Sequence, residues 1–354
     1  MNVDYEKVFD LAINQNASDI HYQSDRRPVI RVSGKLYEVE DAPIFKMQQG
    51  DEDFIKLLNE KSQVEFREKG STDFAFAYKK DFRFRANLYR QQHGLSLSLR
   101  LVRNNILNFE QLGLPNIFLD IAENYRQGFF LFVGPTGHGK STSLASILNH
   151  INSTREEHII TIEDPIEYII DNKKSIIEQR EVGEHTSTFD EALRGAMRQD
   201  PDVIMIGEMR DHETMQAAIT LAETGHLVFS TLHTNNSVQT LDRIIDAFPE
   251  QKQKQIRQQL SGAPTGIISQ RLVPGVDGKL VFAYEQLMAN DAVRNIIRSE
   301  KTEQIYNALQ SGENTEMVRL EQCLVKLAKD GKITREVASA YAINRQLIDV
   351  FFDQ

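Results

Sequence analysis

The chain has 354 residues, which is enough for two or three domains with separate hydrophobic cores. Hydrophobic residues make up 40% of it, but no apolar run approaches the roughly 20 residues that a membrane-spanning helix needs. The single cysteine, Cys323, excludes an internal disulfide and a multi-cysteine metal site. The net charge of −10 argues against nonspecific binding to nucleic acid, and the acidic N-terminus lacks the pattern of a signal peptide. We therefore expect a cytoplasmic protein with no nucleic-acid partner.

The first hundred residues predict a small α+β domain, residues 1–103. Apolar residues at helical spacing indicate helices over 3–15 and 51–67. Short runs of β-branched and aromatic residues indicate strands, two of which are joined by a turn at Ser33 and Gly34. The expected strands cover 19–22, 29–32, 35–39, 74–78, 82–89 and 95–102. Polar residues, a glycine and a proline follow in the segment 104–115, which is the expected linker.

Four arginines lie on the polar side of the last two of these strands: Arg83, Arg85, Arg90 and Arg100. One interpretation is a solvated basic surface. The other is that some of them reach the phosphates of a neighbouring nucleotide, because a fixed planar cation stabilises the charge of a transferring phosphoryl group. The residues by themselves leave both interpretations open.

A glycine-rich segment follows an apolar strand near the middle of the chain. Residues 129–133 are largely apolar, residues 134–142 read GPTGHGKST, and a helix-compatible run follows. This is the strand–loop–helix setting of a phosphate-binding loop (P-loop). Its glycines permit backbone conformations in which successive N–H groups point at one anion, and the helix adds the positive end of its dipole. The residues expected to bind the nucleotide are Gly134, Pro135, Thr136, Gly137, His138, Gly139, Lys140, Ser141 and Thr142.

Two side chains of the P-loop have specific expected roles. Lys140 supplies a cation to the β- and γ-phosphates, which makes it both a binding and a catalytic residue, and the hydroxyl of Ser141 binds Mg²⁺. The sequence therefore predicts a site for ATP and Mg²⁺. A glycine-rich turn that binds nothing is the alternative, but strand, loop and helix all agree with the motif.

Acidic or polar groups follow three further apolar segments, which we expect to be strands of one parallel sheet. These groups are Glu163 with Asp164, Glu208, and His233. Ligands of open α/β sheets bind at the carboxyl ends of the strands, so we expect the three groups to converge on the P-loop. The strands are expected at 158–162, 202–206 and 226–231, and helices at 188–199, 211–224 and 236–247.

The motifs, taken together, resemble those of the ATPases of type II secretion and type IV pili, the GspE/PilT family. Four boxes of that family occur in order: GPTGHGKST at 134–142, TIEDPIEY at 161–168, DPDVIMIGEMRD at 200–211 and TGHLVFSTLHTN at 224–235. The segment AVRNIIR at 292–298 is similar to a signature of the pilus-retraction (PilT-type) subfamily. The assembly ATPases of the family usually carry a four-cysteine zinc motif. This chain has a single cysteine and does not resemble them.

The resemblance implies an α/β fold with a RecA-like P-loop ATPase core over 116–289. It implies that residues 1–103 are PAS-like, that Arg85 and Arg100 approach a phosphate, and that residues 290–354 form a C-terminal helical region. It further implies a homohexamer that powers pilus retraction and twitching motility. Such a ring would act in the cytoplasm at the inner-membrane pilus machinery, against a platform protein (PilC-like) and with a paralogous retraction ATPase as a further partner.

The resemblance also implies roles for the groups at the strand ends. Glu208 is the expected catalytic carboxylate, which orients water and, with Ser141, Glu163 and Asp164, supports Mg²⁺. Glu163 also has an expected catalytic role, and His233 is expected to link the state of the γ-phosphate to domain movement.

One of the departures from the family pattern lies in the P-loop, and three other functions stay open. His138 occupies a P-loop position that is commonly serine, and we expect little effect because the loop binds through backbone N–H groups. The first alternative function is an accessory, PilU-like retraction ATPase that needs a partner motor. The others are a RecA-like nucleic-acid translocase, against which the net charge argues, and a nucleotide-gated binding protein without turnover.

Overall fold

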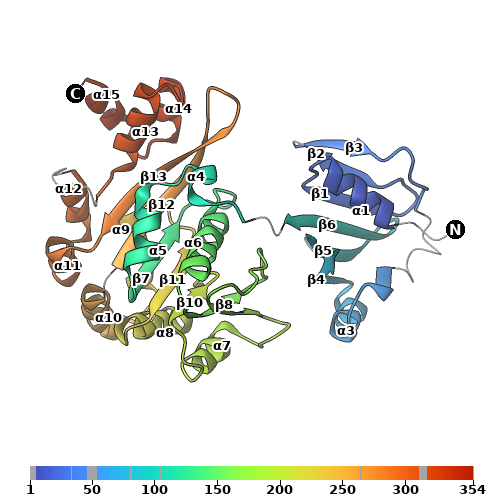
Figure 1. Ribbon diagram of the computed structural model, residues 1–354, viewed down its shortest axis with the longest axis horizontal. Helices are drawn as coiled ribbons and strands as arrows, with labels where there is room; N and C mark the ends of the chain where they lie inside the picture. The colour runs from blue at the N-terminus through green and yellow to red at the C-terminus, as the bar shows by residue number, and fades with distance from the viewer. Residues whose placement is uncertain are drawn as a thin grey trace. The chain divides into compact units, whose positions relative to one another are not determined.

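The structure is a computed structural model that describes residues 5–32, 34–45, 54–79, 82–103, 106–263, 265–310 and 317–353. The chain forms two compact units, Met1–Asn105 and Ile106–Gln354, and each is described here by itself (Figure 1). No helix in the described part of the chain is long and apolar enough to cross a membrane.

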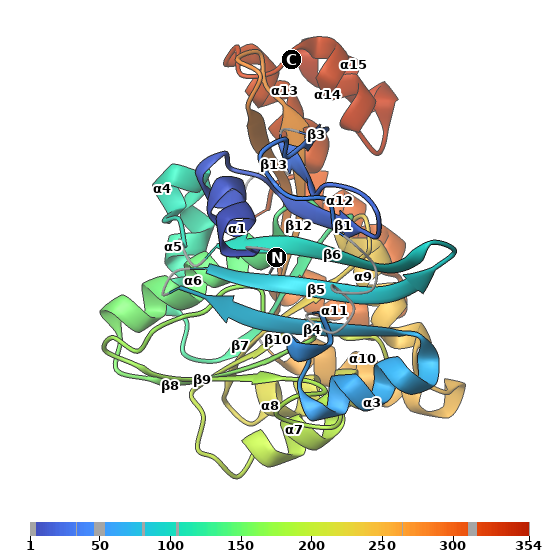
Figure 2. The same ribbon diagram turned by 90° about the vertical axis from the view of Figure 1, so that its right-hand side faces the viewer.

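The N-terminal unit is a six-stranded antiparallel sheet with helices packed on one face. The strand order is β3-β2-β1-β6-β5-β4, and β4, β5 and β6 are the long strands seen in Figure 2. Apolar residues from alternate strand positions meet apolar residues of both helices in one core. The elements are α1 (Tyr5–Asn14), β1 (Asp19–Gln23), β2 (Val29–Val32), β3 (Lys35–Glu38), α3 (Glu60–Lys69), β4 (Ser71–Tyr78), β5 (Phe82–Gln91) and β6 (Gly94–Arg103).

Most of the expected elements of this unit are confirmed, with one helix interrupted. The helix expected over 51–67 is interrupted: residues 54–56 are helical, residues 57–59 are not, and α3 begins at Glu60, where Asn59 caps the first turn by accepting from the Ser62 N–H. Gly70, at a φ of 75°, ends it. Ser33 of the expected turn and residues 51–53 of the expected helix lie outside the described residues.

The C-terminal unit is built on a seven-stranded sheet of order β13-β12-β7-β11-β10-β8-β9. All neighbours are parallel except β12 and β13, which form an antiparallel hairpin. The expected parallel sheet is therefore confirmed, whereas the sequence did not predict β9, β12 and β13. The strands are β7 (Gly128–Val133), β8 (His158–Glu163), β9 (Ile176–Glu181), β10 (Val203–Ile206), β11 (Leu227–Leu232), β12 (Thr265–Pro274) and β13 (Leu280–Met288).

Helices cover both faces of this sheet, which explains why its central strands β7, β10 and β11 are buried along their whole length. Phe129, Leu131 and Val133 of β7 pack with α7 to α11 on one face, and Phe130 and Phe132 pack with α5 and α6 on the other. Helices α13 to α15 pack against the β12–β13 hairpin. The helices are α4 (Phe109–Leu112), α5 (Asn116–Asn124), α6 (Lys140–Thr154), α7 (Phe189–Ala196), α8 (His212–Glu223), α9 (Ser237–Asp246), α10 (Glu250–Gly262), α11 (Asp291–Arg298), α12 (Ile305–Gln310), α13 (Leu320–Lys329), α14 (Arg335–Tyr341) and α15 (Arg345–Asp353).

Candidate functional site

The P-loop joins the buried strand β7 to helix α6, as the motif predicts. Gly134, Gly137 and Gly139 have φ values of 142°, 81° and 81°, in the region that favours glycine. Gly139 is the N-cap of α6 and makes no side-chain capping bond, so the first turn of the helix presents backbone N–H groups that no capping side chain satisfies. Such a turn binds anions, because its N–H groups and the helix dipole both favour negative charge.

Gly134 also lies in close contact with the neighbouring strand β12. A Cβ atom added at Gly134 would be 2.5 Å from the backbone oxygen of Gln270, and Gly134 therefore cannot carry a side chain without movement of one backbone. The P-loop is thus held directly against β12, which the structure places beside β7.

Lys140 is folded back onto the loop. Its Nζ atom donates to the backbone oxygens of Gly134 and Pro135, at 2.7 and 3.0 Å. The side chain is only 7% exposed, and burial lowers the pKa of Lys140 while the carboxylates of Glu167 and Glu208 oppose that shift. A phosphate would offer this cation a charged acceptor in place of two neutral carbonyls.

The groups from the three strand ends converge beside Lys140. His233 Nδ1 lies 3.5 Å from Lys140 Nζ, and His233 Nε2 lies 3.4 Å from Glu208 Oε2. Glu208 also pairs with Arg210, whose Nη1 is 3.7 Å from Asp164 Oδ2. The expected convergence is confirmed for His233, Glu208 and Asp164, which with Lys140 and Arg210 form one chain of polar contacts at the carboxyl edge of the sheet, whereas Glu163 bonds to Thr161 and Gln179.

Glu163 is the most buried of the expected carboxylates, at 7% exposure. It accepts from the Thr161 hydroxyl at 2.7 Å and from Gln179 Nε2 at 3.3 Å. Burial raises the pKa of Glu163 to about 7, although both hydrogen bonds oppose the shift. The group can therefore exchange a proton near neutral pH.

The expected Mg²⁺ ligands fit a site that is shared with phosphate. Among the described residues, no three side chains of His, Cys, Asp or Glu gather as a metal-binding group. Mg²⁺ needs no such cage, because it binds through one or two carboxylates together with phosphate oxygens and water. The Ser141 hydroxyl, in the first turn of α6, and the carboxylates at the strand ends are suitable oxygen donors. The adjacent Thr142 shares a hydrogen bond of 2.8 Å with the Tyr168 hydroxyl.

Arg85 and Arg100 belong to the N-terminal unit and are directly opposite each other on β5 and β6. Arg100 Nε donates to Asp19 Oδ1 at 3.0 Å, and Asp19 is also 4.0 Å from Arg31 Nε. The polar face of this sheet thus carries a row of cations around one carboxylate. An approach of Arg85 and Arg100 to a nucleotide stays a prediction.

Residues of β12 contact the P-loop and were not expected from the sequence. Gln270 Nε2 donates to the backbone oxygen of His138 at 2.7 Å, and the Leu272 N–H donates to His138 Nδ1 at 2.9 Å. The imidazole of His138 is therefore part of the contact between loop and strand. The available signal was the polar sequence Ser269-Gln270-Arg271 inside the otherwise apolar run of β12.

Comparison with known proteins places this site in a family. The family model described as "Type II/IV secretion system protein" matches residues 2–347. The type IV pilus retraction ATPase PilT of Pseudomonas aeruginosa is 40% identical over 336 residues, which cover 95% of this chain and 97% of that protein. The type IV pilus ATPase PilU of the same organism is 37% identical, covering 96% of this chain and 89% of PilU.

A solved structure agrees with these sequence matches. The crystal structure of the pilus retraction motor PilT with bound ADP superposes with a TM-score of 0.91 and 43% sequence identity. The match covers 97% of this chain and 98% of that one, so it includes both units. The chain therefore belongs to the type II/IV secretion system protein family, as an α/β ATPase of the PilT type.

Proposed function

We propose that this chain is the ATP-hydrolysing motor of type IV pilus retraction and that it works as a homohexamer. The observation that carries the proposal is the contact of Lys140 with His233, and of His233 with Glu208, directly beside the P-loop. This arrangement places three groups at one edge of the sheet: the Lys140 cation that can bind phosphate, the Glu208 carboxylate that can orient water, and the imidazole of His233 between them. The similarity to PilT supports pilus retraction as the work that hydrolysis drives.

The division of labour follows the expected domains. We infer that residues 1–103 form a PAS-like domain, 104–115 the linker, 116–289 a RecA-like core and 290–354 a C-terminal helical region. The P-loop and the carboxylates lie in the core. We infer that Arg85 and Arg100 of the PAS-like domain approach the phosphates bound by another subunit of the ring.

Each residue of the core has a separate task in the proposed reaction. Lys140 leaves the carbonyls of the loop and binds the β- and γ-phosphates, where its charge stabilises the transition state. Glu208, which forms an ion pair with Arg210, orients a water molecule for in-line attack on the γ-phosphorus. His233 contacts both side chains, so its position depends on the state of the γ-phosphate and changes when phosphate leaves.

Mg²⁺ would be held by the Ser141 hydroxyl and by the carboxylates of Asp164, Glu163 and Glu208, in part through water. When bound, it would neutralise charge on the β- and γ-phosphates. A nearby divalent cation also favours the ionised form of Glu163, which burial otherwise disfavours.

The partners follow from the proposed role. A pilus motor acts at the cytoplasmic side of the inner membrane, on a platform protein of the PilC kind, and a paralogous retraction ATPase can join it. The similarity to PilU favours one second candidate, an accessory retraction ATPase that needs a partner motor. Motility of cells in which this gene is the sole retraction ATPase separates the two: a primary motor sustains pilus retraction alone, and an accessory one does not.

The ATPase activity is tested with Lys140→Ala and Glu208→Gln. We expect both changes to lower phosphate release by at least about 100-fold, because each removes a group that acts on the transition state. Glu208→Gln should still bind ATP, because the P-loop and Lys140 are intact. Lys252→Ala and Glu250→Gln, both on exposed positions of α10, are matched controls that should keep full activity. Undiminished turnover by Glu208→Gln would remove this residue from catalysis.

A further inference from the structure

His233 lies in a short loop, residues 233–236, between β11 and α9, and side chains of the β12–β13 hairpin bond to this loop and to the start of α9. The first attachment is at Asn235. Its backbone oxygen accepts from Ser269 Oγ at 2.9 Å and from Arg271 Nη2 at 2.8 Å. The same Nη2 lies 3.3 Å from Asn235 Oδ1. Two side chains of β12 therefore fix the middle of the loop.

The second attachment is at the end of the loop, where α9 begins. Glu285 of β13 accepts from both the N–H and the hydroxyl of Ser237, at 2.8 and 2.7 Å. Glu285 is 1% exposed and faces Ser269 directly across the hairpin. One cross-strand pair, Ser269 and Glu285, thus takes part in both attachments, which lie on either side of Asn236.

Arg271 also connects this loop to the P-loop. Its Nη1 donates to the backbone oxygen of Gln270 at 3.0 Å, and a Cβ atom at Gly134 would lie 3.2 Å from the same nitrogen. Arg271 is only 6% exposed, and burial lowers the pKa of its guanidinium. One planar group therefore bonds both to the backbone oxygen of Gln270, which lies against Gly134, and to the backbone oxygen of Asn235 in the loop of His233.

We propose that Ser269, Arg271 and Glu285, here called the loop clamp, are positioning residues that hold His233 between Lys140 and Glu208 for ATP hydrolysis. The physical reason is that Asn235 is only two residues from His233, so a displacement of the Asn235 backbone also displaces the imidazole. Displacing a catalytic contact by about 1 Å can cost 100-fold in rate. The inference rests on the proposed function of His233. It adds that the hairpin on which α13 to α15 pack sets the geometry of the active site.

The test is a double-mutant cycle on the full-length protein, with kcat and KM for ATP measured from phosphate release. Arg271→Lys keeps the positive charge but loses the planar guanidinium, whose two nitrogens bond to Gln270 and Asn235. We expect it to lower kcat about tenfold and to change KM less than about twofold. In a His233→Ala background the same change should have almost no further effect on kcat, because Arg271 acts through His233. Equal losses in both backgrounds would refute the proposal and leave the ATPase assignment intact.

Ser269→Ala serves as a milder variant if Arg271→Lys folds poorly, and hydrogen exchange gives a readout that does not require turnover. We expect the amides of residues 233–236 to exchange faster in either variant without nucleotide, and Glu285→Gln, which keeps an acceptor for Ser237, to resemble the wild type. Unchanged exchange in both Ser269→Ala and Arg271→Lys contradicts the clamp. If the His233→Ala protein hydrolyses ATP too slowly for the double-mutant cycle, the hydrogen-exchange result alone tests the clamp.

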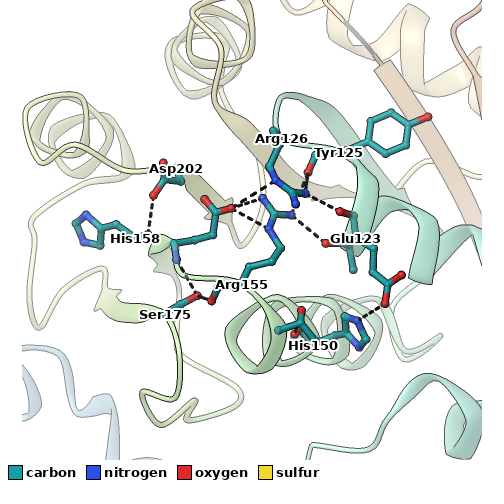
Figure 3. Close-up of polar contacts among 11 residues, drawn as sticks. Glu123, Tyr125, Arg126, His150, Arg155, His158, Ser175 and Asp202 are labelled. Atoms are coloured by element: carbon teal, nitrogen blue, oxygen red, sulfur yellow. Dashed lines mark hydrogen bonds and ion pairs between the residues drawn. The ribbon is translucent and has the colours of Figure 1, made fainter.

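Arg155 provides a control for simple loss of stability. It is another buried arginine that donates to backbone oxygens, those of Ala122 and Tyr125, and it pairs with Glu157 at 2.7 Å (Figure 3). It lies at the C-terminal end of α6, about 22 Å from the P-loop along this 15-residue helix. Arg155→Lys should lower the Tm and leave kcat unchanged below that temperature. If it lowers kcat as much as Arg271→Lys does at equal loss of Tm, the effect is general and the clamp proposal fails.

Discussion

At the scale of single residues, two P-loop glycines with positive φ have different surroundings. Gly134, at 142°, has the backbone oxygen of Gln270 where a Cβ atom would be, at 2.5 Å. Gly137, at 81°, has no atom within 4 Å of that position. The sequence motif treats the two glycines alike. Only Gly134 is needed for a close approach of two backbones, whereas Gly137 is needed for its backbone conformation.

This difference predicts unequal costs for two alanine substitutions. Gly137→Ala should lower the free energy of unfolding by about 1–2 kcal/mol, which is the cost of a left-handed conformation in an L-residue. Gly134→Ala should cost more than about 3 kcal/mol, because β7 or β12 must also move. Urea unfolding of the nucleotide-free proteins measures both values. Equal losses would mean that the contact with Gln270 is of no consequence.

At the scale of elements, β8 and β9 together bury the carboxylate at the end of β8. Glu163 is bonded to Thr161 of its own strand and to Gln179 of β9, and it is directly opposite Glu181, which is 5% exposed. Burial raises the pKa of Glu163 from 4.5 to about 7. The pairing of the two strands, and not the sequence TIEDPIEY at 161–168 by itself, produces this environment, because β9 supplies half of it.

The raised pKa of Glu163 predicts a pH-dependent loss of stability. Below pH 4.5 the carboxyl is protonated in both states; between pH 4.5 and 7 the folded state keeps a proton that the unfolded state releases. Stability therefore falls as the pH rises through this window, by up to about 3 kcal/mol. Glu163→Gln should lack the fall, so its Tm advantage over the wild type should grow from pH 5 to pH 8. Metal- and nucleotide-free samples are compared by thermal unfolding.

A surface carboxylate provides the control for this pH effect. Glu303→Gln, at an exposed position, should follow the wild type at every pH. A Tm difference for Glu163→Gln that stays constant from pH 5 to pH 8 would show that Glu163 is already ionised in the folded protein.

At the scale of the whole molecule, the expected catalytic groups are divided between two units. The P-loop and strand-end groups belong to Ile106–Gln354, and Arg85 and Arg100 to Met1–Asn105. In a ring with head-to-tail contacts, a group from one subunit can complete the site of the next. We infer that the arginines act in this way.

Mixing two inactive proteins tests this inference. One carries Lys140→Ala, and the other carries both Arg85→Ala and Arg100→Ala. When subunits exchange freely at equal amounts, about one quarter of the sites have an intact P-loop facing intact arginines, and about that share of activity should return. Mixing Lys140→Ala with Glu208→Gln is the control and should restore nothing, since both groups belong to one core. No recovery in the first mixture, with rings verified by mass, places the arginines in the same subunit as the P-loop.

The sequence predicted most of the C-terminal unit around the P-loop because the signals there are local. Gly134 to Ser141 follow an apolar strand and precede a helix, and each acidic group directly follows a short apolar run. Parallel strands with crossover helices place their carboxyl ends at one edge, so convergence followed from the order of the elements. β12 and β13 were missed because buried strands have no polar alternation. The helix expected over 51–67 is interrupted at 57–59, where Asn59 caps the start of α3.

By itself, then, the sequence determined the phosphate-binding loop, the strands that end in Glu163, Glu208 and His233, and the family. These depend on residues that are neighbours in the chain. Only the tertiary structure decided that Arg271 and Glu285 contact the loop of His233 and the start of α9, because those contacts join residues 36 and 48 positions apart. The reason is physical: a backbone conformation is set by adjacent residues, whereas burial and hydrogen-bond partners depend on which strands lie side by side.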